Sequence, residues 1–445
     1  MESFKKLGLS QDILKVLNEL KFEKPTEIQE KAIPLAMAGK DIIGGSATGS
    51  GKTLAFASPI IEKLKPNGNV QALIMTPTRE LAIQVAESIK QFSKNKRLNI
   101  LPVYGGVSIN EQIRKLHDTD ILVGTPGRIQ DHINRKTLRL NKVKFLVLDE
   151  VDRMFDMGFS RDVERIIDEC PKDRQTMLFS ATISASIDHL ARKHTRNAVE
   201  VEVESYVDPT KLKQIYYDTP NNLKFSLLVH LLKDEKSNLV MVFCNTRRNV
   251  DFVEKNLKKN KINAVAIHGG LTQNRRSRIM KNFNNATTQV LICTDVAARG
   301  LDIPGVSHVY NYDLPSSSDD YIHRIGRTAR AGKEGIAISI LASRDYDNFS
   351  TITRNKSLKI ERKELPRIER VGIETDFRSP RGSNRGRFDD RGRPGRGISN
   401  RSESPRSRPR RGEPQNTQNG FRGSRSGRTS SNRSQRNRSF NRPRR

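Results

Sequence analysis

Short runs of apolar and β-branched residues alternate along the chain with longer stretches in which apolar residues recur at helical spacing. Four runs lie in the first half, at residues 70–77, 120–126, 143–150 and 176–182, and three follow at 239–246, 263–269 and 289–295. Apolar strands separated by helices are typical of parallel sheets that helices cover on both faces. A polar, proline-containing stretch at 203–214 divides the two series. The pattern therefore predicts an α/β protein with two domains.

Two pairs of segments indicate that the two halves are related. "VYGGVSINEQIRKL" (103–116) resembles "AIHGGLTQNRRSRI" (266–279), and "TDILVGT" (119–125) resembles "TQVLICT" (288–294). Chance similarity between α/β units explains either pair alone. Two pairs in matching order favour a duplicated fold that uses the same loops twice, as it would if one extended ligand crossed both domains.

A glycine-rich segment, "SATGSGKT" at residues 46–53, follows a short strand-like run and precedes a helical one. In this context backbone N–H groups cradle phosphates, Lys52 reaches the outer phosphates and the Thr53 hydroxyl ligates Mg²⁺. A flexible loop that happens to contain glycine and lysine is the alternative. The first position of the pattern, usually Ala or Gly, is Ser46 here.

The run at 143–150 ends abruptly in Asp149 and Glu150, and Asp152 follows. A charged strand end that keeps a sheet soluble is one interpretation. In a parallel sheet, however, ligands bind beyond the carboxyl ends of the strands. There Asp149 would hold Mg²⁺ through water, and Glu150 would polarise the water that attacks a γ-phosphate.

Positive charge is concentrated in the C-terminal part. The formal net charge is +30, of which residues 378–445 supply +17, with 21 arginines against 4 acidic residues. This segment has too few apolar residues to offset the entropy of ordering, so we expect it to be disordered. Its Arg-Gly pairs with occasional phenylalanines, an RGG-like composition, favour RNA tethering by phosphate neutralisation and base stacking. A solubilising tail and a partner-binding segment are the alternatives.

The start of the chain, "MESFKKLGLSQDILKVLNEL", alternates charged and apolar positions as an amphipathic helix does, so we expect no secretory signal. No apolar run approaches the length of a membrane span, and we expect no membrane association. The cysteines Cys170, Cys244 and Cys293 lack metal-ligand spacing. We expect them to be reduced packing residues in a cytoplasmic protein.

Ordered motifs carry a specific resemblance. In chain order, between residues 4 and 345, they are "KFEKPTEIQ", "SATGSGKT", "PTRELA", "GG", "TPGR", "DEVD", "SAT", "VFCNT", "HGGLTQNRR", "CTDVAARGLDI" and "YIHRIGRTARAG". The chain resembles the DEAD-box ATP-dependent RNA helicases. This implies two tandem RecA-like domains with parallel sheets, ATP and Mg²⁺ in the cleft between them, and RNA crossing both. Val151 stands where the family usually has Ala, and we expect activity to persist.

The resemblance also implies the nucleotide contacts. Phe22 is expected to stack on adenine and Gln29 to hydrogen-bond its N6 and N7 edge, so that ATP is preferred over GTP. Arg327 and Arg330 match arginine fingers, which would act only when the cleft closes. The implied catalytic set is Lys52, Asp149, Glu150, Arg327 and Arg330. The implied nucleotide-binding set is Phe4, Phe22, Thr26, Gln29, Ser46, Ala47, Thr48, Gly49, Ser50, Gly51, Lys52, Thr53 and Asp302, with Asp302 at the ribose and Thr53 and Asp149 at Mg²⁺.

RNA contacts follow from the same resemblance. They are mostly backbone amides, hydroxyls and arginines at helix starts, a chemistry suited to phosphates and 2′-hydroxyls without base reading. The implied positions are Pro77, Thr78, Arg79, Gly105, Gly106, Thr125, Pro126, Gly127 and Arg128 in the first half and Gly269, Gln273, Arg276 and Thr294 in the second. Asp152, Ser180, Thr182, His323 and Arg324 are the implied coupling residues between the ATP and RNA sites.

These inferences divide the chain into four segments. They are a RecA-like ATP-binding domain with an adenine-recognition segment (1–204), a linker (205–214), a second RecA-like domain (215–365) and a disordered Arg/Gly/Ser-rich RNA-binding tail (366–445). The predicted function is RNA-stimulated ATP hydrolysis coupled to local, sequence-independent unwinding of RNA duplexes and remodelling of RNA or RNA–protein complexes. Single-stranded and short-duplex RNA are the expected partners, and RNA-processing or ribosome-related proteins are candidates.

Two rival interpretations remain. One is a non-catalytic RNA-binding or annealing protein that acts mainly through its Arg-rich tail, and the other is a DNA translocase. The intact Lys52, Glu150 and Arg327 argue against the first, because a degenerate core need keep none of them. The "HRIGRTAR" and "PTRELA" forms fit the RNA family better than the second.

Overall fold

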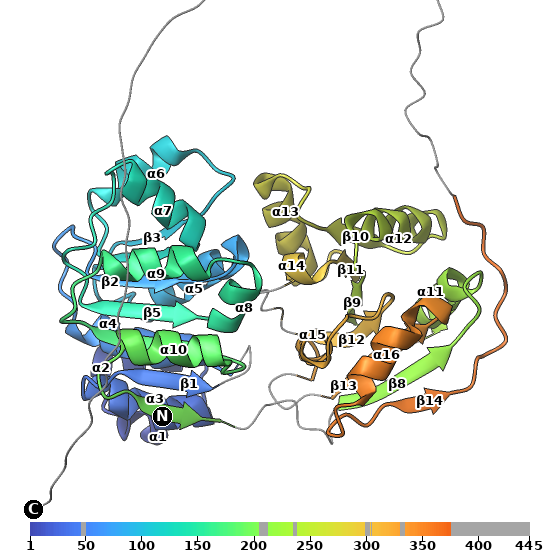
Figure 1. Ribbon diagram of the computed structural model, residues 1–445, viewed down its shortest axis with the longest axis horizontal. Coiled ribbons are helices and arrows are strands. Elements are labelled where there is room, and N and C mark those ends of the chain that lie inside the picture. The colour runs from blue at the N-terminus through green and yellow to red at the C-terminus, as the bar shows by residue number, and fades with distance from the viewer. Residues whose placement is uncertain are drawn as a thin grey trace, which may run out of the picture. The chain divides into compact units, whose positions relative to one another are not determined.

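The structure is a computed structural model, which describes residues 1–45, 50–203, 212–234, 238–298, 303, 305–329 and 334–374. Within these residues the chain forms two seven-stranded sheets with helices packed against them (Figure 1). Each strand pairing in both sheets is parallel. The predicted α/β class with parallel sheets is therefore confirmed.

The first sheet has the strand order β3-β4-β2-β5-β6-β1-β7. Its strands are β1 (Ile42–Gly45), β2 (Ala72–Met75), β3 (Ile100–Val103), β4 (Ile121–Gly124), β5 (Phe145–Asp149), β6 (Gln175–Ser180) and β7 (Val199–Glu202). The helices are α1 (Glu2–Lys5), α2 (Gln11–Glu19), α3 (Glu27–Met37), α4 (Lys52–Lys63), α5 (Arg79–Phe92), α6 (Ile109–Leu116), α7 (Pro126–Asn134), α8 (Val151–Asp156), α9 (Ser160–Asp168) and α10 (Ala185–His194).

The second sheet has the order β10-β11-β9-β12-β13-β8-β14. Its strands are β8 (Leu212–Asp218), β9 (Leu239–Phe243), β10 (Ala264–Ile267), β11 (Val290–Cys293), β12 (Val306–Asn311), β13 (Gly335–Leu341) and β14 (Glu361–Lys363). The helices are α11 (Lys224–Asp234), α12 (Arg247–Lys259), α13 (Gln273–Asn284), α14 (Asp295–Ala298), α15 (Ser318–Ile325), the 3₁₀ turn Ser343–Asp345 and α16 (Tyr346–Thr353).

The two sheets are copies of one topology. In chain order, strands β8 to β14 of the second sheet correspond one by one to strands β1 to β7 of the first. With this correspondence, the order of the strands across the two sheets is identical. The repeated segments seen in the sequence occupy equivalent places, because β3 and β10 precede the paired glycines and β4 and β11 precede the repeated threonines. The predicted duplication is therefore borne out by the strand order.

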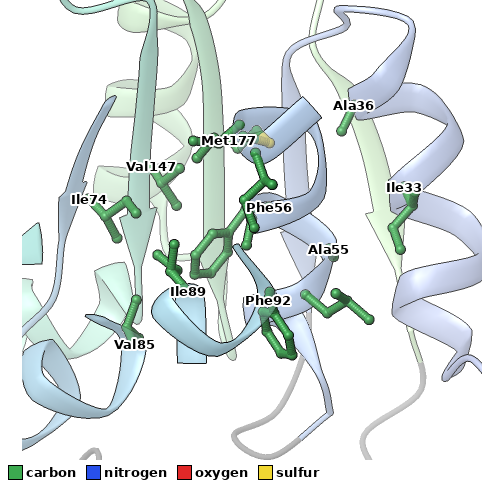
Figure 2. Packing of buried hydrophobic residues seen from close by; sticks show 14 of the residues in the cluster. Ile33, Ala36, Ala55, Phe56, Ile74, Val85, Ile89, Phe92, Val147 and Met177 are labelled. Atoms are coloured by element: carbon green, nitrogen blue, oxygen red, sulfur yellow. The ribbon is translucent and has the colours of Figure 1, made fainter. Parts of the chain in front are cut away.

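Alternating strand residues explain how each sheet is buried on both faces. In β2, Ile74 belongs to the cluster covered by α3, α4 and α5, whereas Leu73 belongs to the cluster on the other face. Figure 2 shows Phe56 of α4 among Ile89 of α5, Val147 of β5 and neighbouring side chains. Because both faces are apolar, polar chemistry is confined to the loops at the strand ends.

The N-terminal segment differs from the single amphipathic helix that its pattern predicted. It forms two helices, α1 and α2, and the chain turns at Gly8, whose φ is +83°. Glycine adopts this left-handed conformation without the steric cost of a side chain, so it ends the first helix although the apolar periodicity continues. Phe4 and Leu17, on either side of the turn, are both fully buried in the same cluster.

The predicted domain boundaries can be compared with the described residues. Residue 204 and residues 205–211 of the predicted linker lie outside them, and residues 212–214 already belong to β8. Residues 375–445 of the predicted tail also lie outside them. Before that point, Val371 N donates to Ser226 Oγ at 3.2 Å and Glu374 N donates to Asn256 Oδ1 at 2.7 Å. Contacts with the second domain thus extend past the predicted boundary at 365, as far as Glu374.

Two further expectations concern membrane spans and cysteines. No helix in the described part of the chain combines the length and the apolar character needed to cross a bilayer. Cys170, Cys244 and Cys293 are all buried free thiols, and burial raises the pKa of each. Each lies in an apolar core cluster, which agrees with the predicted packing role.

Candidate functional site

Two acidic residues stand where the central strand β5 ends. Asp149 is the last residue of β5, and Glu150 follows as the N-cap of α8 with φ and ψ both 55°. A left-handed conformation is costly for a residue with a side chain, so it marks a position that the surrounding structure enforces. Asp149 and Glu150 are 3% and 5% exposed. They are therefore not the solvated strand end that was the alternative.

Lys52 lies opposite these acids at the first position of α4. Its Nζ is 3.6 Å from Asp149 Oδ1, and both side chains are buried. Gly51, immediately before it, has φ of +92°, a conformation that favours glycine and that lets the chain turn sharply from the loop into the helix. Thr53 follows in the first turn of α4, on the same side of the sheet's carboxyl edge.

The electrostatics of this edge leave room for a cation. Burial raises the pKa of Asp149 to about 6, although the positive charge of Lys52 opposes the shift. Among the described residues, Asp149 Oδ1 and both carboxylate oxygens of Asp152 are buried without a hydrogen-bond partner. Mg²⁺ prefers oxygen ligands, so a buried carboxylate oxygen without a hydrogen-bond partner, such as Asp149 Oδ1, fits the predicted ion.

Thr26 and Gln29 hold the end of the glycine-rich segment. Thr26 Oγ1 donates to Ser50 O at 2.7 Å and Gln29 Nε2 donates to Gly51 O at 3.0 Å. Gln29 Oε1 also accepts from Thr26 N at 3.0 Å, completing a capping box at the start of α3. Both polar ends of the Gln29 amide are thus engaged by the protein. Adenine recognition would require Gln29 to share or exchange these bonds.

The aromatic residues of the predicted adenine pocket have different exposures. Phe4 is fully buried and packs edge-on against Phe22, with ring centroids 6.4 Å apart. Phe22 is partly buried and also meets the edge of Phe92 at 6.2 Å. Phe4 therefore supports Phe22 from behind and has no face left for a ligand. Phe22 keeps an accessible surface, as stacking on a base requires.

Some predicted residues fall outside the described ranges. They are Ser46, Ala47, Thr48, Gly49, Asp302 and Arg330. Val151, the departure from the family pattern, is fully buried in the core cluster on α8.

A cavity of about 530 Å³ brings together most of the predicted RNA contacts from both domains. Its lining residues are Pro77, Thr78, Arg79, Glu80, Gly105, Thr125, Gly127, Arg128, Asp131, Met157, Phe159, Gly269, Arg276 and Val296. Gly106, Pro126, Gln273 and Thr294 are not among them. Glu80, Asp131, Met157, Phe159 and Val296 were not predicted.

Helix starts build the first-domain side of this cavity. Thr78 caps α5 by accepting a hydrogen bond from Leu81 N at 3.3 Å, and Thr125 is the N-cap of α7. Arg79 lies against the paired glycines, where a Cβ on Gly106 would overlap its guanidinium. Gly106 also has φ of +84°, a conformation that favours glycine, and glycine leaves room for the arginine beside it. Backbone N–H groups at helix starts, with an adjacent arginine, make a site suited to phosphates.

The second domain repeats part of this design with a residue that the sequence reasoning missed. Thr246 caps α12 by accepting from Asn249 N at 3.1 Å, as Thr78 caps α5. Arg247 then lies against Gly269, 3.1 Å from where a Cβ would stand, as Arg79 lies against Gly106. The signal was present in the sequence, since "NTR" at 245–247 repeats "PTR" at 77–79.

Glu80 joins two predicted RNA contacts of the second domain. Its Oε2 is 2.9 Å from Arg276 Nη2, and its Oε1 accepts from Gln273 Nε2 at 3.2 Å. Arg153, next to the acidic group, likewise reaches Asp320 of α15 at 3.3 Å. Ion pairs therefore tie both the acids after β5 and the cavity of the first domain to residues of the second domain. Neither Glu80 nor Asp320 was predicted, because contacts between residues so distant in sequence leave no local pattern.

The predicted coupling residues connect these regions in different ways. Ser180 Oγ accepts from Asp152 N at 3.3 Å and donates to Thr182 O at 2.7 Å, so it connects the end of β6 to the start of α8. Arg324 is 1% exposed and binds both carboxylate oxygens of Asp295 at 2.6 Å. Because its side chain is almost fully buried, Arg324 can influence the ATP and RNA sites only through the residues that it contacts. His323 and Arg327 lie close together, with Arg327 Nε donating to His323 O at 3.3 Å.

Comparisons with known proteins agree with this arrangement. Family models described as DEAD/DEAH box helicase and helicase conserved C-terminal domain match residues 26–190 and 223–332. "DEAD-box ATP-dependent RNA helicase CshA" of Bacillus cereus is 44% identical over 372 residues, which cover 83% of this chain and 71% of that protein. Its Geobacillus kaustophilus namesake is 44% identical over 373 residues, covering 83% and 80%.

Solved structures add the fold. S. cerevisiae Dbp5 bound to RNA and ADP BeF3 matches with a TM-score of 0.75 and 34% identity, over 82% of this chain and 96% of that chain. Its match spans both sheets, which are therefore two RecA-like domains. The motifs, the duplicated fold and these relatives lead to one assignment: the chain belongs to the DEAD-box ATP-dependent RNA helicase family.

Proposed function

We propose that this chain hydrolyses ATP in an RNA-stimulated reaction and uses the cycle to separate short RNA duplexes locally, without reading sequence. The observation that carries the proposal is the joint placement of a buried Lys52–Asp149–Glu150 group and a cavity to which both domains contribute arginines and glycines. A protein that only binds RNA needs no buried lysine and carboxylates of this kind. The relatives named above, one of them solved with RNA and a nucleotide, support the same conclusion.

The first domain supplies the chemistry. Lys52 neutralises charge on the outer phosphates, and the N–H groups at the start of α4 add the positive end of the helix. Glu150, fixed by its backbone conformation, orients and polarises the attacking water. Asp149 and Thr53 would hold Mg²⁺, which supplies charge neutralisation at the phosphates when bound.

The second domain completes the reaction. Arg327 and Arg330 would stabilise charge on the transferring phosphoryl group, since a planar guanidinium matches its oxygens. Asp302 would contact the ribose. Because these residues belong to a different domain from Lys52, hydrolysis requires both domains to engage the nucleotide. RNA that bridges both domains would favour that arrangement, and this is the basis of stimulation.

RNA binding would use the cavity without reading bases. Its predicted contacts are N–H groups, hydroxyls and arginines, which recognise phosphate and 2′-hydroxyl groups. Arg276 already pairs with Glu80, so an arriving phosphate would share or displace that carboxylate. We include Arg247 among the contacts, as the counterpart of Arg79. The Arg-rich tail would add affinity by neutralising further phosphates.

The proposed activity on RNA also bears on the location and the partners of the protein. We place the protein in the cytoplasm, with RNA-processing or ribosome-related proteins as candidate partners. The annealing alternative is disfavoured because Lys52, Asp149 and Glu150 are kept and are buried together. DNA translocation is disfavoured because the predicted contacts include hydroxyl recognition.

A strand-displacement assay tests the proposal. A labelled RNA duplex of about ten base pairs should separate with ATP and Mg²⁺ and remain paired without nucleotide, whereas a duplex of about thirty should resist, because each further step adds stacking energy. Run with pre-separated strands, the assay also measures annealing. If ATP gives no separation while annealing proceeds without nucleotide, the chain is an RNA-annealing protein and the proposal fails.

A further inference from the structure

A small group of buried polar side chains lies behind Arg128 in the first domain. Gln112 of α6 is 5% exposed and His132 of α7 is fully buried. Gln112 Nε2 donates to Tyr104 O at 3.1 Å, and Gln112 Oε1 accepts from Arg128 Nη1 at 3.0 Å. His132 Nε2 is 3.0 Å from the same Gln112 oxygen. One amide therefore connects three segments: the end of β3, α6 and α7.

The hydrogen-bond roles in this group are determined by its partners. Because the Gln112 nitrogen faces a carbonyl, its oxygen must face the arginine and the imidazole, so His132 Nε2 carries a proton. His132 Nδ1 lies 2.9 Å from Thr137 Oγ1, a hydroxyl that is also within donor distance of His132 O at 3.1 Å. Burial and the charge of Arg128 both lower the pKa of His132, which keeps the ring neutral. The Gln112 amide cannot flip without placing its NH₂ group against two donors.

What the group holds in place is the predicted phosphate site. Tyr104 immediately precedes the Gly105–Gly106 pair, and Val107, which follows it, accepts from both Nη atoms of Arg128 at 3.2–3.3 Å. Arg128 and Gly105 both line the cavity. A free arginine side chain loses much rotamer entropy on binding, whereas one already fixed loses less.

We propose that Gln112, oriented by His132, is a positioning residue that presents Arg128 and the glycine pair as one preformed phosphate site. The inference rests on the proposed RNA-binding role of Arg128. Gln112 touches no RNA itself and acts through Arg128 and the backbone that it anchors.

The duplicated fold gives this assignment a contrast. Gln112 lies seven residues after the first glycine of its pair, and the residue at the same distance from Gly269 is Arg276. Both are buried and both lie on the helix after the glycines, α6 and α13. The same helical position therefore carries an arginine that lines the cavity in one domain and an amide that orients an arginine in the other.

The test measures RNA-stimulated ATPase of the full chain as a function of RNA concentration. Gln112→Met, which keeps the side-chain length and removes the three hydrogen bonds to Tyr104, Arg128 and His132, should raise the half-saturating RNA concentration by about tenfold and leave kcat at saturating RNA within about twofold. If that variant fails to fold, Thr137→Val, which frees only the far side of His132, should raise it by about threefold. In an Arg128→Ala background, Gln112→Met should cause little further rise in the half-saturating RNA concentration, since the arginine that Gln112 positions is gone.

Gln71→Met is the matched control. Gln71 is 1% exposed, its Nε2 donates to Lys65 O at 2.8 Å, and its Oε1 accepts from Lys144 Nζ at 3.1 Å, so it has the same bonding pattern at the other edge of the sheet. This variant should lower Tm without changing the half-saturating RNA concentration. Unchanged RNA dependence in folded Gln112→Met, or an equal loss in the Arg128→Ala background, would overturn the positioning role. If Arg128→Ala itself has no effect, the RNA-binding proposal fails instead.

Discussion

The two domains share a strand order, yet the loops after corresponding strands carry different chemistry. After β2 and β9 the design is kept, because Thr78–Arg79 and Thr246–Arg247 both cap a helix and cover a glycine pair. After β1 comes the glycine-rich segment with Lys52, whereas β8 is followed by Thr219 and Pro220. The duplicated strand order thus keeps one loop design in both domains and places the glycine-rich segment with Lys52 after β1 and not after β8.

The acids at the ends of β5 and β12 also differ between the domains, in how many hydrogen bonds and ion pairs the protein gives to each carboxylate. Asp149 has Lys52 Nζ at 3.6 Å as its ion-pair partner. Asp313, just beyond β12, is held by Arg344 Nη2 at 2.8 Å, Asn249 Nδ2 at 2.7 Å and the backbone N–H of Asn245 at 3.1 Å. A carboxylate whose bonding capacity is filled by the protein stabilises the fold, whereas one left open is available to a ligand.

The largest expected effect comes from removing the second domain's share of the ATP site. Arg327→Ala should lower kcat of the RNA-stimulated ATPase by about 10³- to 10⁵-fold, the usual contribution of an arginine finger. Arg327→Lys should not restore the rate, because an ammonium lacks the planar fork. Steady-state ATPase at saturating RNA measures both. Arg354→Ala, an exposed arginine of the same domain, is the control, and a parental rate in Arg327→Ala would place the second domain outside the chemistry.

Glu150→Gln tests the first domain's share. The amide cannot accept a proton from water, so kcat should fall by about 10²- to 10⁴-fold while ATP and RNA still bind. The variant should therefore accumulate as a complex with both ligands, which co-sedimentation or fluorescence anisotropy detects. Glu164→Gln on α9 controls for loss of charge. Turnover at the parental rate would show that Glu150 has been assigned the wrong role.

Stability distinguishes the two strand-end acids. Asp313→Asn should lower the free energy of unfolding of the second domain by about 3 kcal/mol, because its NH₂ group would face donors in a buried ionic group. Asp149→Asn should leave the Tm unchanged or raise it, since it removes a buried charge whose pKa is already raised to about 6. Thermal unfolding of both variants provides the comparison. Equal losses would mean that Asp149 is a structural residue too.

The smallest effect is expected from removing the positively charged tail, which belongs to neither domain. A chain ending at residue 377 should need roughly tenfold more RNA for half-maximal ATPase and should show a flatter dependence on salt, because fewer counterions are released. Its kcat at saturating RNA should be kept. Replacing Phe388, Phe421 and Phe440 with serine in the full chain should weaken binding without changing the salt slope. An unchanged slope after truncation would exclude the tail from phosphate binding.

The sequence predicted those parts of the molecule whose signals are local. Apolar runs located the strands, and the acids after β5 located the carboxyl edge, because both patterns repeat over a few residues. Contacts such as Glu80–Arg276 and Arg153–Asp320 join residues far apart in the chain and depend on topology. The turn at Gly8 was missed because apolar periodicity continued through it. Gln112 and His132 were missed because single polar residues in amphipathic helices look like solvent-facing positions.

The central claim is that RNA held by both domains drives ATP hydrolysis in a site assembled from both. It is tested most directly by titrating the steady-state ATPase with RNA and with DNA of the same sequence, using the full chain and the chain ending at residue 377. The account predicts strong stimulation by RNA and little by DNA, with the same kcat at saturating RNA in both chains. A rate that does not depend on RNA, or that DNA raises equally, would contradict it.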